Sequence, residues 1–116
     1  MQRKGTSRLD KINEELKREI SNLINYKLHD PRITGMISVT KVKITPDLRY
    51  VKVYVSILNS SNKELDLKAL KSAAGFMRSE IAKEINLRVT PEISFELDET
   101  LEYGAHIDEL IRRIQK

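Results

Sequence analysis

The spacing of hydrophobic residues changes several times along the chain, and each change predicts a boundary between elements. Between residues 7 and 28 the apolar positions recur every three or four residues, which is the period of an amphipathic helix. Over 36–45 and 49–58 they alternate with polar residues, which predicts two strands. The helical period returns over 64–86, and alternation returns over 93–97. The predicted order is therefore α-β-β-α-α-β.

Three local features refine this order. The alternation slips its phase near Thr40, so we expect a β-bulge in the first strand. The short turn around Pro46 joins the first two strands into an antiparallel hairpin. Gly75 interrupts the second helical stretch, and glycine inside a helix costs roughly 0.5–1 kcal/mol relative to alanine. We therefore expect a kink or a close backbone contact at Gly75, between a helix over 64–74 and one that runs to residue 86.

These elements predict an α+β fold with a three-stranded mixed sheet, in the order α-β-β-α-kink-α-β. The third strand follows a helical crossover, so it is expected to pair in parallel with the second strand. Each strand alternates, so helices should cover one face of the sheet and leave the other face open. Phe76 is expected in the core. The side chains expected on the open face are Lys43, Lys52, Tyr54, Ser94 and Glu96.

Length and composition fit one domain over residues 1–116, with a basic arm at 1–6 and a short C-terminal helix within 99–116. Cysteine is absent and there are two histidines, so neither a disulfide framework nor a zinc site is expected. No apolar run reaches the roughly 18 residues of a membrane span, and the polar start lacks the apolar core of a signal peptide. We therefore expect a cytoplasmic monomer without a cofactor.

The charge of the chain is unevenly distributed. The formal net charge is +4 and the pI is about 9.4. Residues 1–60 carry twelve Lys or Arg and six Asp or Glu, whereas residues 61–116 carry nine and eleven. A basic front half favours a polyanionic partner. Ordinary solvated charge explains the same distribution, so charge alone does not decide between them.

The sequence contains no pattern typical of an enzyme. It shows no nucleophile with a base, no phosphate-binding loop and no cluster of metal ligands. His29 and His106 are isolated, which favours capping or surface roles. Two kinds of non-catalytic protein stay open. One binds RNA. The other is a protein-interaction module that uses the exposed sheet face, with its basic charge serving solubility.

Several stretches match a known family in the same order. They are the helical segment 8–24, Asp-Pro-Arg at 30–32, Asp-Leu-Arg-Tyr-Val-Lys-Val-Tyr-Val at 47–55, Leu-Lys-Ser-Ala-Ala-Gly-Phe-Met-Arg at 70–78, Leu-Arg-Val-Thr-Pro-Glu-Ile at 87–93 and Leu-Glu-Tyr-Gly at 101–104. Over nearly its whole length the chain resembles the bacterial ribosome-binding factor A family. The resemblance implies a KH-like fold of the second topological type. It also implies a factor that binds the free small (30S) ribosomal subunit and assists late maturation of its 16S rRNA, a GTPase that releases it, and a role in growth in the cold.

The resemblance also points to a site. Where an ordinary KH domain clamps nucleic acid with a Gly-x-x-Gly loop, this family has an Ala-x-Gly kink, which maps onto Ala73, Ala74 and Gly75. We expect contacts to RNA shape and phosphate to dominate there. Tyr50 and Tyr54 could stack on bases, but packing across the sheet is favoured. The candidate RNA-binding residues near the kink are Lys68, Lys71, Ser72, Ala73, Gly75, Arg78, Lys83 and Arg88, and the secondary candidates are Arg3, Lys4, Arg8, Arg32 and Lys52.

Overall fold

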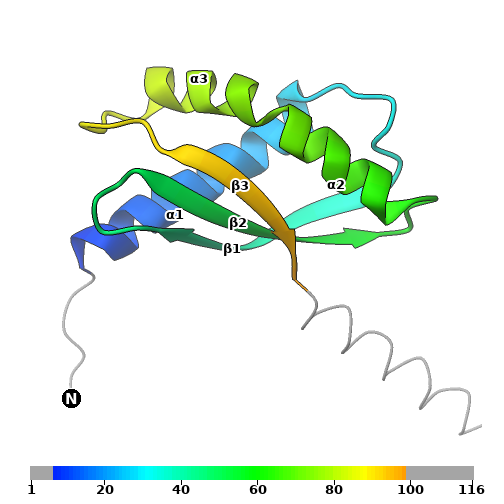
Figure 1. Cartoon of the computed structure of the whole chain (residues 1–116), viewed down its shortest axis with the longest axis horizontal. Coiled ribbons are helices and arrows are strands. Elements are labelled where there is room, and N and C mark those ends of the chain that lie inside the picture. Colours follow the sequence, from blue (N-terminus) through cyan, green and yellow to red (C-terminus); the bar gives the residue numbers. More distant parts are fainter. Residues whose placement is uncertain (1–6, 99–116) are drawn as a thin grey trace, which may run out of the picture.

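A computed structural model describes residues 7–98, and its elements follow the predicted order (Figure 1). They are α1 (Arg8–Asn22), the π-helix η1 (Leu23–Lys27), β1 (Met36–Ile44), β2 (Tyr50–Leu58), α2 (Lys63–Ser72), α3 (Ala74–Glu84) and β3 (Glu92–Leu97). The predicted boundaries of helices and strands are confirmed to within one or two residues. The predicted basic arm at 1–6 and C-terminal helix at 99–116 lie outside the described residues.

The three strands form one mixed sheet in the order β1-β2-β3. β1 and β2 pair antiparallel, and their register shifts between Val39 and Lys41, which confirms the predicted bulge. β2 and β3 pair in parallel, starting with Tyr50 opposite Glu92. The predicted hairpin and the predicted parallel crossover are both confirmed.

The hydrophobic core lies between one face of this sheet and the helices (Figure 1). Val51, Val53 and Val55 of β2 are at most 1% exposed, and they belong to one cluster with Leu16 of α1 and Leu70 of α2. The helices therefore cover one face, as predicted. On the other face the predicted polar side chains are exposed or half-buried: Lys43, Lys52, Tyr54, Ser94 and Glu96.

The first helix differs from the predicted continuous helix over 7–28. It begins with a capping box, in which the Ser7 hydroxyl accepts a hydrogen bond from the Asp10 backbone and the Asp10 carboxylate accepts one from the Ser7 backbone. At its other end it widens into η1, where the Leu28 N–H donates to the Leu23 carbonyl over 2.8 Å. The π-helical turn leaves both Leu23 and Ile24 buried.

The break between α2 and α3 falls at Ala73 rather than at Gly75. Ala73 has φ −88° and ψ 1°, which lies outside the helical region, and its N–H is shared between the carbonyls of Ala69 and Leu70. The helix resumes at once, because the Met77 N–H donates to the Ala73 carbonyl over 3.0 Å. The prediction of a kink in this segment is confirmed: the break lies at the first residue of the Ala73–Gly75 kink that the resemblance implies, two residues before the glycine that interrupts the helical period.

Gly75 lies in the first turn of α3 and has no positive φ. A Cβ added there would meet no atom within 4 Å, so the alternative explanation of this glycine by a close backbone contact is wrong for the described part of the chain. Phe76 also departs from the prediction. It is 43% exposed, because the neighbouring Met77 occupies the inward position of this turn.

Candidate nucleic-acid interface

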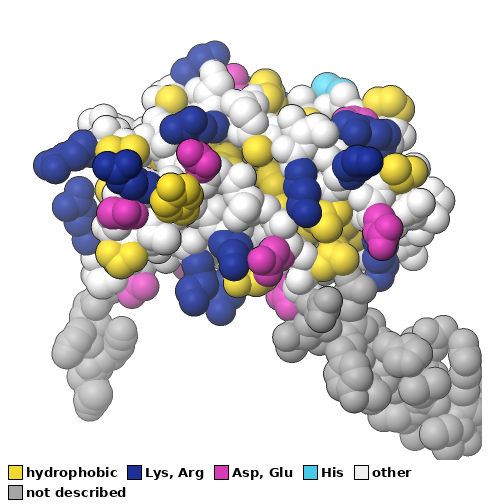
Figure 2. All heavy atoms as spheres, viewed as in Figure 1, with side chains coloured by type: hydrophobic (Ala, Val, Ile, Leu, Met, Phe, Trp, Pro, Cys, Tyr) yellow, Lys and Arg dark blue, Asp and Glu magenta, His cyan; other side chains and the backbone are white. Residues whose placement is uncertain are grey.

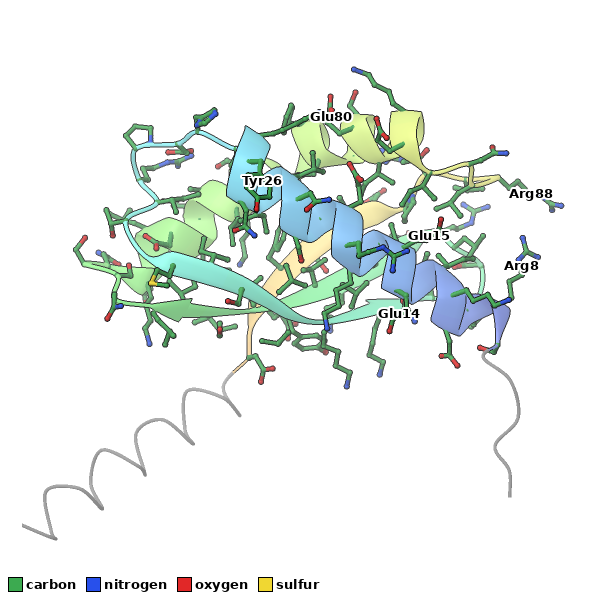
Figure 3. The ribbon with its side chains drawn as sticks, turned by 180° about the vertical axis from the view of Figure 1, so that it is seen from behind. Arg8, Glu14, Glu15, Tyr26, Glu80 and Arg88 are labelled. Atoms are coloured by element: carbon green, nitrogen blue, oxygen red, sulfur yellow. The ribbon has the colours of Figure 1, made fainter. Side chains whose placement is uncertain are left out.

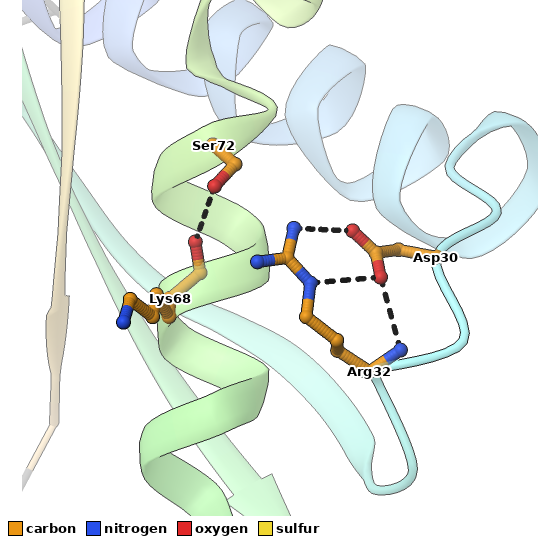
Figure 4. A network of polar contacts seen from close by, with 4 residues as sticks. All are labelled: Asp30, Arg32, Lys68 and Ser72. Carbon is orange, nitrogen blue, oxygen red and sulfur yellow. Dashed lines mark hydrogen bonds and ion pairs between the residues drawn. The ribbon is translucent and has the colours of Figure 1, made fainter.

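The exposed side of α2 and α3 carries a row of the predicted RNA-binding residues. Lys68, Lys71, Gly75 and Arg78 follow one another at intervals of three or four, so they share one side of the two helices. All four are exposed. The hydroxyl of Ser72 donates to the Lys68 carbonyl over 3.0 Å (Figure 4), which keeps this side chain against the same turn of α2.

Arg32 joins this row from the loop that precedes β1. Its guanidinium donates to the Asp30 carboxylate through Nη2 at 2.7 Å and through Nε at 3.1 Å, and its backbone N–H donates at 2.9 Å. These hydrogen bonds lower the pKa of Asp30 to about 2 and raise the pKa of Arg32. The guanidinium is directed toward the turn of α2 that carries Lys68 and Ser72 (Figure 4). We name this surface the helical face, defined as Arg32, Lys68, Lys71, Ser72, Ala73, Gly75 and Arg78.

The Arg32 loop is tied to α2 by Asp66, which the sequence had not singled out. Asp66 is 0% exposed, and its carboxylate accepts hydrogen bonds from the backbone N–H groups of Thr34 at 3.3 Å and Gly35 at 3.0 Å. A Cβ on Gly35 would lie 2.7 Å from Ser60 Cβ and 2.8 Å from the Leu58 carbonyl oxygen. Only glycine therefore allows this close approach. A carboxylate on the buried side of an amphipathic helix was the signal that could have revealed the anchor.

Arg78 bridges α3 to the start of the third strand. Its Nε and Nη2 donate to the Thr90 carbonyl at 3.3 and 3.0 Å, which fixes the guanidinium at the edge of the helix. An arginine has five N–H donors, so this contact leaves part of the fork available to a phosphate. A hollow lies beside it, lined by Ala74, Gly75, Arg78, Glu92 and Ile93.

Two further candidates, Arg8 and Arg88, come together at one end of the molecule although they are far apart in sequence (Figure 3). They line a hollow next to the turn between β1 and β2. Asp47 in that turn accepts hydrogen bonds from the Thr45 hydroxyl and the Arg49 N–H, which lower its pKa. Figure 2 shows basic side chains gathered at this end and again over α2.

Lys83 and Lys52 do not belong to the helical face. Lys83 Nζ lies 3.3 Å from Glu80, which also pairs with Lys27 at 3.3 Å, and these contacts lower the pKa of Glu80. Lys52 lies on the open face of the sheet, 3.2 Å from Glu96. The structure thus separates residues that the sequence analysis had grouped. The remaining candidates, Arg3 and Lys4, are outside the described residues.

The chemistry of the helical face suits contacts to a nucleic-acid backbone. Guanidinium, ammonium and hydroxyl groups donate hydrogen bonds that phosphate oxygens accept. Within residues 7–98, no group of three His, Cys, Asp or Glu side chains is placed to hold a metal ion. Among the same residues, no helix has both the length and the apolar character needed to cross a membrane.

Comparison with known proteins settles the family. The family described as Ribosome-binding factor A matches residues 8–111. The chain belongs to the ribosome-binding factor A family. One relative, Ribosome-binding factor A of Clostridium beijerinckii, is 59% identical over 108 residues, which cover 91% of this chain and 92% of the relative.

Solved structures support the same assignment. The crystal structure of ribosome-binding factor A from Thermus thermophilus is 25% identical with a TM-score of 0.70, and covers 78% of this chain and 97% of that one. A homology model of the Thermus thermophilus factor, fitted into a cryo-electron microscopy map of a 30S–RbfA complex, is 26% identical with a TM-score of 0.60. That match covers 72% of this chain and 88% of the other. The predicted KH-like α+β fold is confirmed.

Proposed function

We propose that this protein is a non-catalytic assembly factor that binds the free small (30S) ribosomal subunit and assists late maturation of its 16S rRNA. The observation that carries the proposal is the similarity to the Thermus thermophilus factor fitted into a 30S complex. Family membership over residues 8–111 and the basic helical face support it.

The helical face offers a thermodynamic mechanism. Arg32 and Arg78 are held in place by Asp30 and by the Thr90 carbonyl, so little ordering of these side chains is needed when a phosphate arrives. Lys68 adds positive charge on a flexible stem. Binding to one conformation of an immature rRNA region shifts the population toward that conformation, by as much as the affinities for the two conformations differ.

The remaining parts of the proposal concern the cellular context. The chain would act as one RNA-binding domain and as a monomer in the cytoplasm, where the subunit is assembled, without a cofactor. A GTPase would release it from the mature subunit. Loss of the factor would impair growth in the cold, because misfolded RNA is harder to rescue at low temperature. Equal growth of a deletion strain at low and normal temperature would contradict this last part.

Sedimentation with ribosomal particles tests the central proposal. The purified protein is mixed with free small subunits, large subunits or intact ribosomes, and each mixture is run on a sucrose gradient at low and at moderate salt. Comigration with small subunits alone, weakened by salt, is the expected result. Comigration with none of the particles would refute the function while leaving the fold unaffected.

A further inference from the structure

The side of the sheet that faces away from the helices carries a second basic surface. Lys43 on β1 lies directly opposite Lys52 on β2, and Lys41 lies opposite Tyr54. The three lysines are exposed, and Lys41 Nζ is 5.8 Å from the centre of the Tyr54 ring. We name this surface the sheet face, defined as Lys41, Lys43, Tyr50, Lys52 and Tyr54.

Positive charge on the sheet face is only partly balanced. Like charges directly opposite each other on neighbouring strands destabilise a sheet, and Lys43 and Lys52 form such a pair. Lys52 is relieved by Glu96 on β3, at 3.2 Å. Within residues 7–98, no carboxylate forms an ion pair with Lys41 or Lys43. Glu96 lies on β3, and the Asp98 carboxylate accepts a hydrogen bond from the Thr40 hydroxyl of β1 at 2.6 Å, so the positive charge without an ion pair on this surface is that of Lys41 and Lys43.

Aromatic rings alternate with the lysine along β2. Tyr50, Lys52 and Tyr54 point to the same face, and residues two apart in a strand are separated by about 6.8 Å. Tyr50 is 54% exposed, so packing across the sheet accounts for Tyr54 better than for Tyr50. Rings for stacking beside a line of cations are the composition with which proteins bind single-stranded nucleic acid.

We propose that the sheet face binds a segment of single-stranded RNA, with bases stacked on Tyr50 and Tyr54 and phosphates along Lys41 and Lys43. The face lies on the opposite side of the sheet from the helical face, so the two surfaces would engage different RNA segments. Lys52, one of the predicted RNA-binding residues, lies on this face beside Glu96, so it can contact RNA only if the sheet face binds RNA. The inference rests on the proposed function only in taking RNA as the ligand.

The chemistry of the face favours RNA over a protein partner. Between the row of Tyr50 and the row of Tyr54, the residues on this side are lysine, tyrosine, serine and glutamate. Lysine, glutamate and serine are depleted from protein–protein interfaces, and only the two tyrosines belong to the residue types enriched there. A polyanion with aromatic bases matches both groups that the face does offer.

Binding of the full chain to a fluorescein-labelled ten-nucleotide oligouridylate, followed by fluorescence anisotropy at two salt concentrations, tests the inference. The double variant Lys41→Glu/Lys43→Glu should weaken binding about tenfold or more. The slope of log affinity against log salt concentration should become shallower by about 1.4, because single strands release about 0.7 counterions per contact and two contacts are lost. The matched control is Lys11→Glu/Lys17→Glu, which makes the same charge change on exposed positions of α1. The loss of affinity in this control should be at least five times smaller than the loss in the sheet-face variant.

Two tyrosine variants separate stacking from charge. Tyr50→Ala should weaken binding about fivefold or more, because stacking on an aromatic ring is lost. Tyr50→Phe keeps the ring and should bind within twofold of the unmodified protein. Nuclear Overhauser contacts between uracil protons and the Tyr50 ring should be present in the unmodified protein. A merely structural role for Tyr50 would produce no such contacts.

Several outcomes would overturn the inference. They are failure of the unmodified protein to bind the oligonucleotide, and equal affinity of the sheet-face and α1 variants for it. If thermal denaturation shows that the glutamate variant is unfolded, Lys41→Gln/Lys43→Gln takes its place. Sedimentation with small subunits is scored separately, so oligonucleotide binding without comigration would refute the proposed function alone, and the reverse result would refute the inference alone.

Discussion

The helical face and the sheet face carry the same sign of charge but hold it differently. On the helical face, Arg32 and Arg78 are fixed by hydrogen bonds to Asp30 and to the Thr90 carbonyl. On the sheet face, lysines on flexible stems lie beside tyrosine rings. Arginine forks in a fixed position favour geometric recognition of phosphate, whereas lysines act as mobile point charges. The same sign of charge therefore supports selective contact on one face and tolerant contact on the other.

The helical face also depends on a buried hydrogen-bond anchor, Asp66, which the sheet face does not use. Asp66 of α2 holds the backbone of Thr34 and Gly35, in the loop that carries Arg32, from inside the fold. The lysines of the sheet face stand on strands whose register is set by their pairing and by the buried valines of β2. Removal of the Asp66 anchor should therefore weaken binding by the helical face and leave binding by the sheet face largely unchanged.

The largest expected effect comes from removing that anchor. Asp66→Ala leaves the part-buried N–H groups of Thr34 and Gly35 without their acceptor, and a fully buried unsatisfied donor costs about 1–3 kcal/mol. Urea denaturation should show a free energy of unfolding lowered by about 2–4 kcal/mol. Small-subunit affinity should fall with it, while oligouridylate binding by the sheet face should change little below the unfolding transition.

Glu64→Ala is the control for this change, since it removes an exposed carboxylate from the same helix. It should cost less than about 1 kcal/mol, the usual range for a charge in the first turn. Gly35→Ala should reproduce the Asp66 defect by pushing the loop away from the Leu58 carbonyl. Comparable stability of Asp66→Ala and Glu64→Ala would show that the carboxylate is not an anchor.

The second prediction concerns charge on the helical face. Lys71→Glu/Arg78→Glu should weaken binding to small subunits about tenfold or more. The slope of log affinity against log salt concentration should fall by about one for each phosphate contact that is lost. Arg78→Lys keeps the charge but loses the fork that spans to Thr90, so its effect should be intermediate. Filter binding over a range of salt concentrations compares both variants with the unmodified protein.

The control again is Lys11→Glu/Lys17→Glu on α1, which changes the net charge of the protein by the same amount. Equal losses in this control and in the helical-face variant would mean that binding responds to net charge and not to a defined surface. Lys83→Glu adds a finer test. Because Lys83 is paired with Glu80 away from the helical face, it should weaken binding less than Lys71→Glu alone.

The third prediction separates stability from binding at Gly75. A Cβ added there meets nothing within 4 Å, and the residue has helical geometry. Gly75→Ala should therefore raise the free energy of unfolding by about 0.5–1 kcal/mol, because alanine loses less backbone entropy in a helix. If RNA approaches the backbone here, small-subunit affinity should fall by a few fold while stability rises. Affinity that rises or stays constant with stability would exclude a close RNA contact at this glycine.

Periodicity predicted most of the fold because burial itself is periodic. Alternation in β2 was sufficient to assign Val51, Val53 and Val55 to the core and Lys52 to the open face. The phase slip at Thr40 was sufficient to place the bulge. These features depend on neighbours within the same element, which a sequence displays directly.

Features that depend on distant partners were missed or misplaced. The π-helical end of the first helix has no distinct residue pattern, since it shares its apolar stripe with α1. The break at Ala73 lies within the kink at 73–75 that the resemblance implies, whereas the residue pattern alone pointed to Gly75, because glycine is the residue associated with kinks even though alanine adopts the bridge conformation here. The Asp66 anchor joins residues more than 30 positions apart. The candidate site was predicted as a set of residue types, but only the fold divides them among separate surfaces.

The smallest expected effect tests whether fixing Arg32 matters, through the acid dependence of stability. The pKa of Asp30 is about 2 in the folded protein, below its usual 3.8. The unfolded chain therefore binds more protons between these values, and the contribution of Asp30 is fully present above pH 4 and is lost as the pH falls through 2. Asp30→Asn should remove this part of the pH dependence. Urea denaturation at several pH values from 2 to 5 measures it as the difference between the two proteins, so that the lowered pKa values of Glu80 and Asp47 cancel. Above pH 5 the difference in stability between the two proteins is at its largest but still small, because an exposed ion pair contributes little. Their affinities for small subunits should then differ only through the freedom of the Arg32 guanidinium. If Asp30→Asn binds small subunits more weakly, the helical face depends on a fixed arginine. If its affinity is unchanged, the charge of Arg32 is sufficient, as proposed for the lysines of the sheet face.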